Sequence, residues 1–136
     1  MIIGIGTDIF ETERIAKGMS KQRFLSRIFT ERELRYCSNK PKESAAGLFA
    51  AKEAAVKAMG IGFTGFWPCD VEIAHNAQGM PFVCPHGHFK DICDSKQACF
   101  HVSISHTKDI VIAFAIAETA EEAESESRIQ PANAYD

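Results

Sequence analysis

The stretch FAAKEAAVKAMG, from Phe49 to Gly60, carries charged side chains in a pattern that can do chemistry. Successive helical residues turn by about 100°, so a helix here places Phe49, Glu53 and Lys57 on one face that runs towards Gly60. That face offers an acid and an ammonium to a bound molecule. Glutamate four residues before lysine is also a common helix-stabilising pair, so the helix alone leaves a functional site and an ordinary ion pair open.

Residues 2–9 predict a β-strand with two unlike faces. Isoleucines and a threonine on one face alternate with Gly4, Gly6 and Asp8 on the other. Two glycines that lead to an acid indicate that another backbone or a ligand approaches this face closely. The alternative is a packing groove in which Asp8 is a turn former at the end of the strand.

The composition of the chain is typical of one globular domain. The chain has 136 residues, of which 46% are hydrophobic. Its net charge of −3 argues against a general nucleic-acid binder. No apolar run approaches the roughly 18 residues that cross a bilayer, and the five cysteines lack CxxC spacing. We therefore expect a soluble, cytoplasmic protein with reduced thiols and no membrane or nucleic-acid partner.

Cysteines and histidines gather between residues 84 and 101, but they lack the close-spaced pairs of a structural zinc site. The candidates alternate across a predicted turn, a helix and a strand. They are Cys84, His86, His88, Cys93, Cys99 and His101. We expect core thiols and surface histidines here and no zinc site.

Charge is distributed unevenly along the chain. Residues 14–42 hold nine basic side chains against two acids, Glu31 and Glu33. Taken alone, this segment is an ordinary solvated face. The C-terminal residues are acidic and poor in apolar side chains, so we predict a single domain over residues 1–118 and an acidic, disordered tail over 119–136.

Turn and cap signals divide the chain into helices and strands. Thr12, Ser20 and Thr30 can each cap a helix, and Thr30 also forms a capping box with Glu33. The strands of the second half pair as two hairpins. We predict an α+β fold with helices packed on an antiparallel sheet. The predicted helices cover 13–19, 20–28, a segment from 31, 41–60 and 88–97, and the predicted strands cover 2–9, 70–73, 81–84, 100–105 and 110–117.

Three separated motifs lie in a specific order along the chain. They are Gly6-Thr7-Asp8, the stretch from 49 to 60, and Val102-Ser103-Ile104-Ser105-His106-Thr107-Lys108. Together they resemble the holo-[acyl-carrier-protein] synthase family, the small type of 4′-phosphopantetheinyl transferase. The likeness continues through residues 23–30 and 71–73, Gly79 and Pro81, and so covers residues 1–118. An ordered set of this kind is specific, whereas one short motif is not.

The resemblance implies that the phosphopantetheine arm of coenzyme A is transferred to a serine of apo acyl carrier protein for fatty-acid biosynthesis, releasing adenosine 3′,5′-bisphosphate. Asp8 and Glu53 match the Mg²⁺ ligands of the family, and Lys57 matches a residue used against the phosphates. These three are the catalytic candidates. Displacement at a pyrophosphate develops negative charge on oxygen, which a hard cation and an ammonium both stabilise.

The resemblance also implies a coenzyme A cleft, for which packing and turn roles are the alternative. The matching positions are Phe49, Lys57, Gly60, Pro81, His106 and Thr107. Leu48 departs from the family pattern, because members often carry an arginine there that contacts the phosphates of the nucleotide. Lys40 or Lys42 could replace that contact.

A homotrimer is implied as well, in which Asp8 and Glu53 act with His106 and Thr107 of the partner subunit. Acyl carrier proteins are acidic, so basic side chains near the N-terminus could steer one to the site. These docking candidates are Arg14, Lys21, Arg23 and Arg27, with Arg14 as our first choice.

Two other functions stay open at this stage. One is a transferase for the carrier domains of polyketide or peptide assembly lines, although the chain is short compared with the larger, two-lobed relatives. The other is a catalytically silent, nucleotide-binding trimer. For the serine proton, our hypothesis is a general base formed by Asp8, Glu53 or a cation-bound water.

Overall fold

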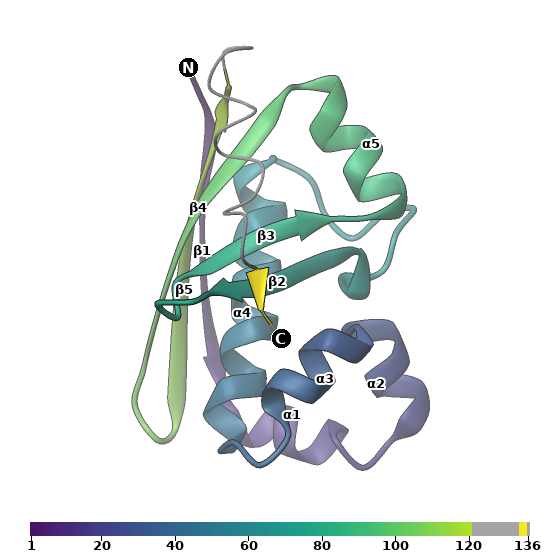
Figure 1. The fold of residues 1–136 in the computed structure, drawn as a ribbon, viewed down its shortest axis with the longest axis vertical. Helices are drawn as coiled ribbons and strands as arrows, with labels where there is room; N and C mark the ends of the chain where they lie inside the picture. Colours follow the sequence, from purple (N-terminus) through teal and green to yellow (C-terminus); the bar gives the residue numbers. More distant parts are fainter. Residues whose placement is uncertain (121–133, 136) are drawn as a thin grey trace.

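The computed structural model describes residues 1–120 and the backbone of residues 134 and 135. Within them, two antiparallel sheets and a set of helices confirm the predicted α+β class (Figure 1). The first sheet has the order β1-β5-β4, and the second has the order β3-β2-β6. The predicted disorder of residues 121–133 and 136 lies outside the described residues. The strands are β1 (Ile2–Glu11), β2 (Val71–Asn76), β3 (Pro81–Pro85), β4 (Ala98–His106), β5 (Ile110–Thr119) and β6 (Ala134–Tyr135).

Both predicted hairpins are confirmed. In the first, β2 pairs with β3 so that Ile73 lies opposite Val83. In the second, β4 pairs with β5 so that Val102 lies opposite Ala115. The N-terminal strand β1 joins the second hairpin through β5, which therefore becomes the central strand of the first sheet.

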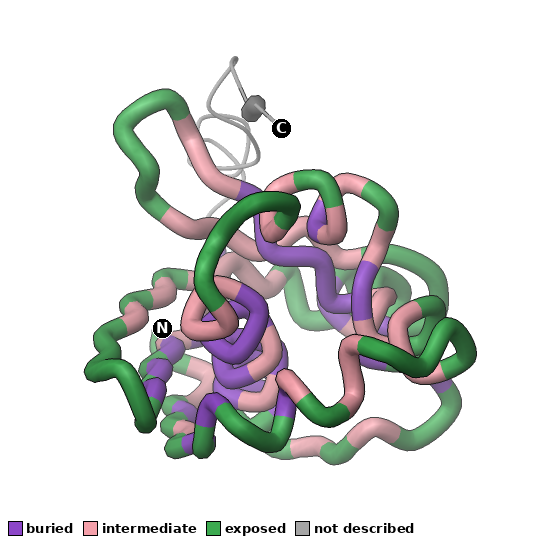
Figure 2. Tube along the Cα trace, turned by 90° about the horizontal axis from the view of Figure 1, so that it is seen from below, coloured by how far each residue is buried: buried purple, intermediate pink, exposed green. Residues whose placement is uncertain are grey.

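Helix α4 (Lys42–Ala58) is the central element and runs along one face of the first sheet (Figure 1). Its side chains at the predicted core positions Leu48, Ala51, Ala55 and Met59 are all buried. Figure 2 shows it end on as a largely buried coil inside the molecule. Because most of its residues are alanine, its backbone can approach the sheet closely.

Gly4 and Gly6 are the points where α4 lies nearest to β1. A Cβ atom added to Gly4 would stand 2.2 Å from the carbonyl oxygen of Ala58, and one added to Gly6 would stand 2.0 Å from that of Ala54. Both distances are far below a normal contact. The sequence predicted that either another backbone or a ligand approaches the glycine face of β1, and in the structure the backbone of α4 does so.

The opposite face of the first sheet carries large apolar side chains that remain exposed. Ile5 is 62% exposed, Ile9 68% and Ile112 49%. The inward positions of β5 are small or β-branched, such as Val111 and Ala113, because α4 leaves little room there. The outward isoleucines and Phe114 form what we call the outer sheet face.

The shorter helices lie at the two ends of the molecule (Figure 1). Helices α1, α2 and α3 gather at one end, and α5 lies at the other. No helix among the described residues is both long and apolar enough to span a bilayer. The bounds are α1 (Thr12–Gly18), α2 (Gln22–Ile28), α3 (Glu31–Cys37), α5 (Gly87–Ser95) and the 3₁₀ turn η1 (Pro68–Asp70).

One of the three predicted helix caps is correct. Thr30 caps α3 in a reciprocal capping box with Glu33. The prediction for Thr12 is wrong, because this residue lies inside α1 and its hydroxyl donates to the carbonyl of Lys108 at 2.8 Å. The prediction for Ser20 is also wrong, since its hydroxyl donates back to the carbonyl of Lys17 and α2 begins only at Gln22.

A buried ion pair joins α4 to its neighbours, and the sequence reasoning missed it. The Lys52 ammonium lies 2.7 Å from the Glu33 carboxylate and also donates to the carbonyl of Val71 at 2.8 Å. Both charged side chains are fully buried. Burial lowers the pKa of Lys52 and raises that of Glu33, while the charge of each partner opposes that shift. A sequence signal existed, because Lys52 falls on the same helix face as Leu48 and Ala55.

Candidate active site

The structure brings Asp8, Glu53 and Lys57 together where the end of β1 meets α4. The Lys57 ammonium donates to the carbonyl of Thr7 at 2.9 Å and lies 3.4 Å from the Asp8 carboxylate. Asp8 follows Gly6 on the face that contacts α4, so the close approach at the glycine sets the position of this acid. The three catalytic candidates thus form one group, drawn from segments about 50 residues apart.

The electrostatics of this group favour a cation. Burial raises the pKa of Asp8, and this rise is opposed by the hydrogen bond and charge of Lys57 and by the charge of Arg14. Burial also raises the pKa of Glu53, and the negative charge of Asp8 raises it further. The two carboxylates therefore lie within each other's field and repel one another when both are ionised.

The donor set fits a hard divalent cation such as Mg²⁺. One oxygen of Asp8, Oδ2, is buried and has no hydrogen-bond partner among the described residues. A buried carboxylate oxygen without a partner is costly unless another charge satisfies it. Asp8 and Glu53 supply the oxygen ligands that Mg²⁺ prefers and are few enough to leave positions for phosphates and water.

A separate cleft of about 450 Å³ contains two of the predicted coenzyme A positions, Pro81 and His106. Leu48, where the family often carries arginine, also lines it. The rings of Tyr36 and His75 stack in its wall, with centroids 4.0 Å apart and planes at 7°. None of the three catalytic candidates is among the described residues that line this cleft.

The other predicted cleft residues have packing or turn roles within this chain. The ring of Phe49 packs 4.8 Å from that of Phe10. Gly60 ends α4 with a φ of +73°, a conformation that favours glycine. Thr107 shapes the β4–β5 turn through a backbone hydrogen bond to Ile110 at 2.9 Å. Phe49, Gly60 and Thr107 are not among the described residues that line the cleft.

The structure separates the two lysines that could compensate for Leu48. Lys42 forms an ion pair with Glu13 of α1. The Lys40 ammonium lies 4.3 Å from the centre of the Tyr36 ring, which belongs to the cleft wall. Lys40 is therefore the lysine placed beside the cleft.

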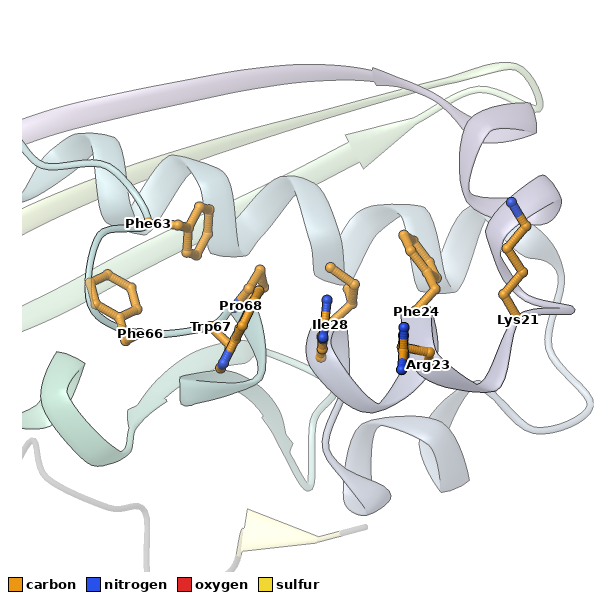
Figure 3. A pocket seen from close by; sticks show the side chains of 9 residues that line it. Lys21, Arg23, Phe24, Ile28, Phe63, Phe66, Trp67 and Pro68 are labelled. Carbon is orange, nitrogen blue, oxygen red and sulfur yellow. The ribbon is translucent and has the colours of Figure 1, made fainter.

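Three of the four docking candidates surround a second hollow, of about 530 Å³, beside α2 (Figure 3). We call it the basic groove. The Arg27 guanidinium stacks 4.7 Å from the ring centre of Trp67, which is 54% exposed. Arg14 is not among its lining residues and lies instead over the Phe10 ring, at 4.9 Å. The groove is lined by Lys21, Arg23, Phe24, Arg27, Ile28, Phe63, Phe66, Trp67 and Pro68.

Comparison with known proteins adds evidence independent of this geometry. Residues 4–115 match the family model of the 4′-phosphopantetheinyl transferase superfamily. The holo-[acyl-carrier-protein] synthase of Clostridium tetani is 43% identical over 122 residues, which cover 87% of this chain and 97% of the relative. The superfamily match and this relative therefore extend over most of the chain.

Crystal structures of proteins named holo-[acyl-carrier-protein] synthase are also similar to this chain in fold. The crystal structure of holo-[acyl-carrier-protein] synthase from Neisseria meningitidis has a TM-score of 0.78 at 35% identity and covers 87% of this chain and 99% of that one. The Bacillus anthracis protein of the same name, in complex with CoA (3′,5′-ADP), has a TM-score of 0.74 at 34% identity. It covers 88% of this chain and 99% of that one.

Proposed function

The chain belongs to the 4′-phosphopantetheinyl transferase superfamily, and we infer from this that it is a holo-[acyl-carrier-protein] synthase. It transfers the 4′-phosphopantetheine group of coenzyme A to a serine of apo acyl carrier protein and releases adenosine 3′,5′-bisphosphate. The observation that carries this conclusion is the group formed by Asp8, Glu53 and Lys57, in which Oδ2 of Asp8 is buried and has no hydrogen-bond partner among the described residues. The chain that holds this group matches the superfamily model over residues 4–115.

We propose that Asp8 and Glu53 hold Mg²⁺. When bound, the cation supplies positive charge to the pyrophosphate oxygens of coenzyme A. Lys57 adds a second positive charge, and its contacts with Thr7 and Asp8 hold the ammonium in one position. A positioned ammonium stabilises the charge that develops on the leaving phosphate.

The cleft with Pro81 and His106 is our proposed site for the nucleotide part of coenzyme A. The relative from Bacillus anthracis was solved in complex with CoA (3′,5′-ADP), which supports coenzyme A as the ligand of this chain. His106 can donate to a phosphate oxygen. Lys40, beside the cleft, supplies a positive charge in place of the arginine that family members often carry at the position of Leu48.

We propose a homotrimer in which the outer sheet face is the contact between subunits. Ile5, Ile9 and Phe114 expose apolar area on one side of one sheet, and such patches mark protein interfaces. Asp8 and the His106 cleft are separate within one chain, so a neighbouring subunit that brings a cleft to the acids would complete the site. Residues Phe49, Gly60 and Thr107 could still meet coenzyme A at such a junction.

The acyl carrier protein is proposed to dock on the basic groove and Arg14. Arg14 lies over the Phe10 ring, and its charge reaches the catalytic group: burial raises the pKa of Asp8 and Glu53, and the positive charge of Arg14 opposes that rise. An acidic helical partner can pair its charges with Lys21, Arg23 and Arg27 and place apolar side chains on Trp67.

Charge reversal at Arg14 tests the docking proposal. Arg14→Glu should weaken carrier binding at least tenfold and reduce its dependence on salt, while coenzyme A binding stays unchanged. Lys17→Glu is the matched control, because it makes the same charge change on the same helix at a residue outside the proposed docking set. Equal effects of the two variants would refute a specific role for Arg14.

For the serine proton, we propose that Asp8 or Glu53 is the general base. Both acids belong to the catalytic group, and we assign His106 to binding of the nucleotide. His106→Ala should therefore raise the KM for coenzyme A and leave the shape of the pH–rate profile unchanged. An ionisation near neutral pH that disappears in this variant would identify His106 as the base instead.

We propose fatty-acid biosynthesis in the cytoplasm as the setting, since no disulfide joins the five cysteines, all of which lie in the described part of the chain. The direct test is to incubate the protein with Mg²⁺, coenzyme A and apo acyl carrier protein and to weigh the carrier by mass spectrometry. A mass gain that Asp8→Asn abolishes supports the transferase. Coenzyme A binding without a gain would indicate a silent module, and a gain only on assembly-line carrier domains would indicate the other class of carrier.

A further inference from the structure

Three side chains with metal-binding atoms meet at the end of the first sheet, away from the catalytic group. Cys99 and His101 are two residues apart on the edge strand β4, so they share one face. Glu118 of the central strand β5 lies directly opposite Cys99 in the pairing register. All three point to the outer sheet face. The sequence reasoning considered Cys99 and His101 and missed Glu118, because strand pairing alone brings it to them.

The distances between these side chains are those of a ligand set. The His101 Nε2 atom lies 2.9 Å from Glu118 Oε1, and Cys99 Sγ lies 3.8 Å from the same oxygen. All three ligand atoms lie within 4.8 Å of one another, and among the described residues this is the one group of three that does so. Tetrahedral bonds of about 2.0–2.3 Å to zinc separate the ligand atoms by about 3.3–3.6 Å. Changes of at most about 1.5 Å in these separations would therefore suffice to close the set on an ion.

We propose that Cys99, His101 and Glu118 bind one transition-metal ion of the Zn²⁺ type, at the end of the outer sheet face that we assign to the contact between subunits. Thiolate and imidazole are ligands that Zn²⁺ prefers and Mg²⁺ does not, so this site is chemically distinct from the all-oxygen pair Asp8 and Glu53. The alternative is a plain hydrogen bond between His101 and Glu118 with a thiol nearby.

Backbone structure holds the three ligands in place before any ion binds. Cys99 and His101 belong to one regular strand, and the β4–β5 ladder fixes their distance from Glu118. The β4–β5 pairing already places the three ligands among the described residues, so their backbone loses little entropy when the ion binds. An ion here would tie the edge strand β4 to the central strand β5 through side chains.

Binding at this site uses the thiolate form of Cys99. The ligand form of cysteine is the thiolate, so the Cys99 thiol gives its proton to solvent as the sulfur–metal bond forms, with no change of oxidation state. The apparent affinity should therefore weaken as the pH falls.

Titration with Co²⁺ of the full chain, kept reduced with a phosphine, tests the proposal. Excess Mg²⁺ fills the Asp8 and Glu53 pair and leaves a site with sulfur and nitrogen ligands for cobalt. We expect a sulfur-to-cobalt charge-transfer band that saturates at one ion per chain and that Zn²⁺ displaces. A wild-type protein without this band would overturn the proposal.

Variants make the assignment specific. Cys99→Ser should abolish the band, and His101→Ala should weaken binding at least tenfold, while circular dichroism shows an unchanged fold because both side chains lie on the sheet surface. Cys69→Ser and His88→Ala are the matched controls and should titrate like the wild type. Persistence of the band in Cys99→Ser would place the ion at another cysteine and refute the site.

A thermal shift gives a second, independent readout. At a hundredfold excess over its dissociation constant, Zn²⁺ should raise the melting temperature of the wild type by about 5–10 °C and leave that of Cys99→Ser unchanged. An equal rise in both proteins would mean that the ion binds elsewhere.

Discussion

Replacing Gly6 by alanine should damage both stability and activity, because the backbone of α4 occupies the space that the new methyl group needs. A Cβ at this position would stand 2.0 Å from the carbonyl oxygen of Ala54. A carbon and a carbonyl oxygen normally approach to about 3.3 Å, so β1 and α4 must separate by about 1.3 Å. The obstacle is backbone and cannot be relieved by a change of rotamer.

This separation affects the two carboxylates directly. Asp8 follows Gly6 on β1, and Glu53 precedes Ala54 on α4, so the two acids move apart by a similar distance. Overpacking costs about 1–3 kcal/mol of stability, and a misplacement of about 1 Å at a reacting group can cost about 100-fold in rate. We expect losses of these sizes in the free energy of unfolding and in kcat/KM.

Urea denaturation and the carrier mass-gain assay measure the two effects. Gly62→Ala is the matched control, because a Cβ there meets no atom within 4 Å. It should keep the stability and activity of the wild type. If Gly6→Ala behaves like this control, the close approach of β1 and α4 does not position the acids, and our account of the site is wrong.

Three further predictions concern the buried Lys52–Glu33 pair, the half-buried His75 and the outer sheet face. Lys52→Met leaves the buried Glu33 without its partner, so urea denaturation should show that the free energy of unfolding falls by about 3–5 kcal/mol. Adding Glu33→Gln to the same chain should recover part of this loss. An unchanged free energy of unfolding in Lys52→Met would contradict the prediction. Burial, and to a smaller extent the charge of Lys40, lower the pKa of His75 from its usual value of 6.5. The folded state therefore favours the neutral ring, and the free energy of unfolding falls as the pH drops below 6.5. His75→Phe should lose less stability between about pH 7 and pH 5, and an identical pH dependence would refute the role of His75. If the proposed trimer forms through the outer sheet face, Phe114→Lys should give monomers in analytical ultracentrifugation and lower kcat/KM at least tenfold. A fully active monomer would refute the shared site.

Local signals in the sequence were sufficient for several elements. The capping box of Thr30 and Glu33 was predicted correctly because both of its hydrogen bonds join residues three apart. The hairpins were predictable from alternation and turn residues, and the buried face of α4 from its helical spacing. The family resemblance also needed only ordered motifs along the chain.

Two features of the fold depended on residues far away in the sequence. Thr12 was expected to cap its own helix, but its hydroxyl bonds to the carbonyl of Lys108, which is 96 residues away in sequence. Likewise, Lys52 next to Glu53 gave no local indication that its partner would be Glu33.

Helical spacing alone placed Glu53 and Lys57 on one face and left an ordinary ion pair open, and the resemblance of ordered motifs to a known family gave Asp8, Glu53 and Lys57 their expected roles, because motif order is a property of the chain. Tertiary structure decided that Asp8 joins them and that Pro81 and His106 line a different cleft. It also decided that Cys99, His101 and Glu118 meet. These outcomes depend on strand pairing and on the approach of α4 to two glycines, contacts whose free energy comes from residues far apart in the sequence.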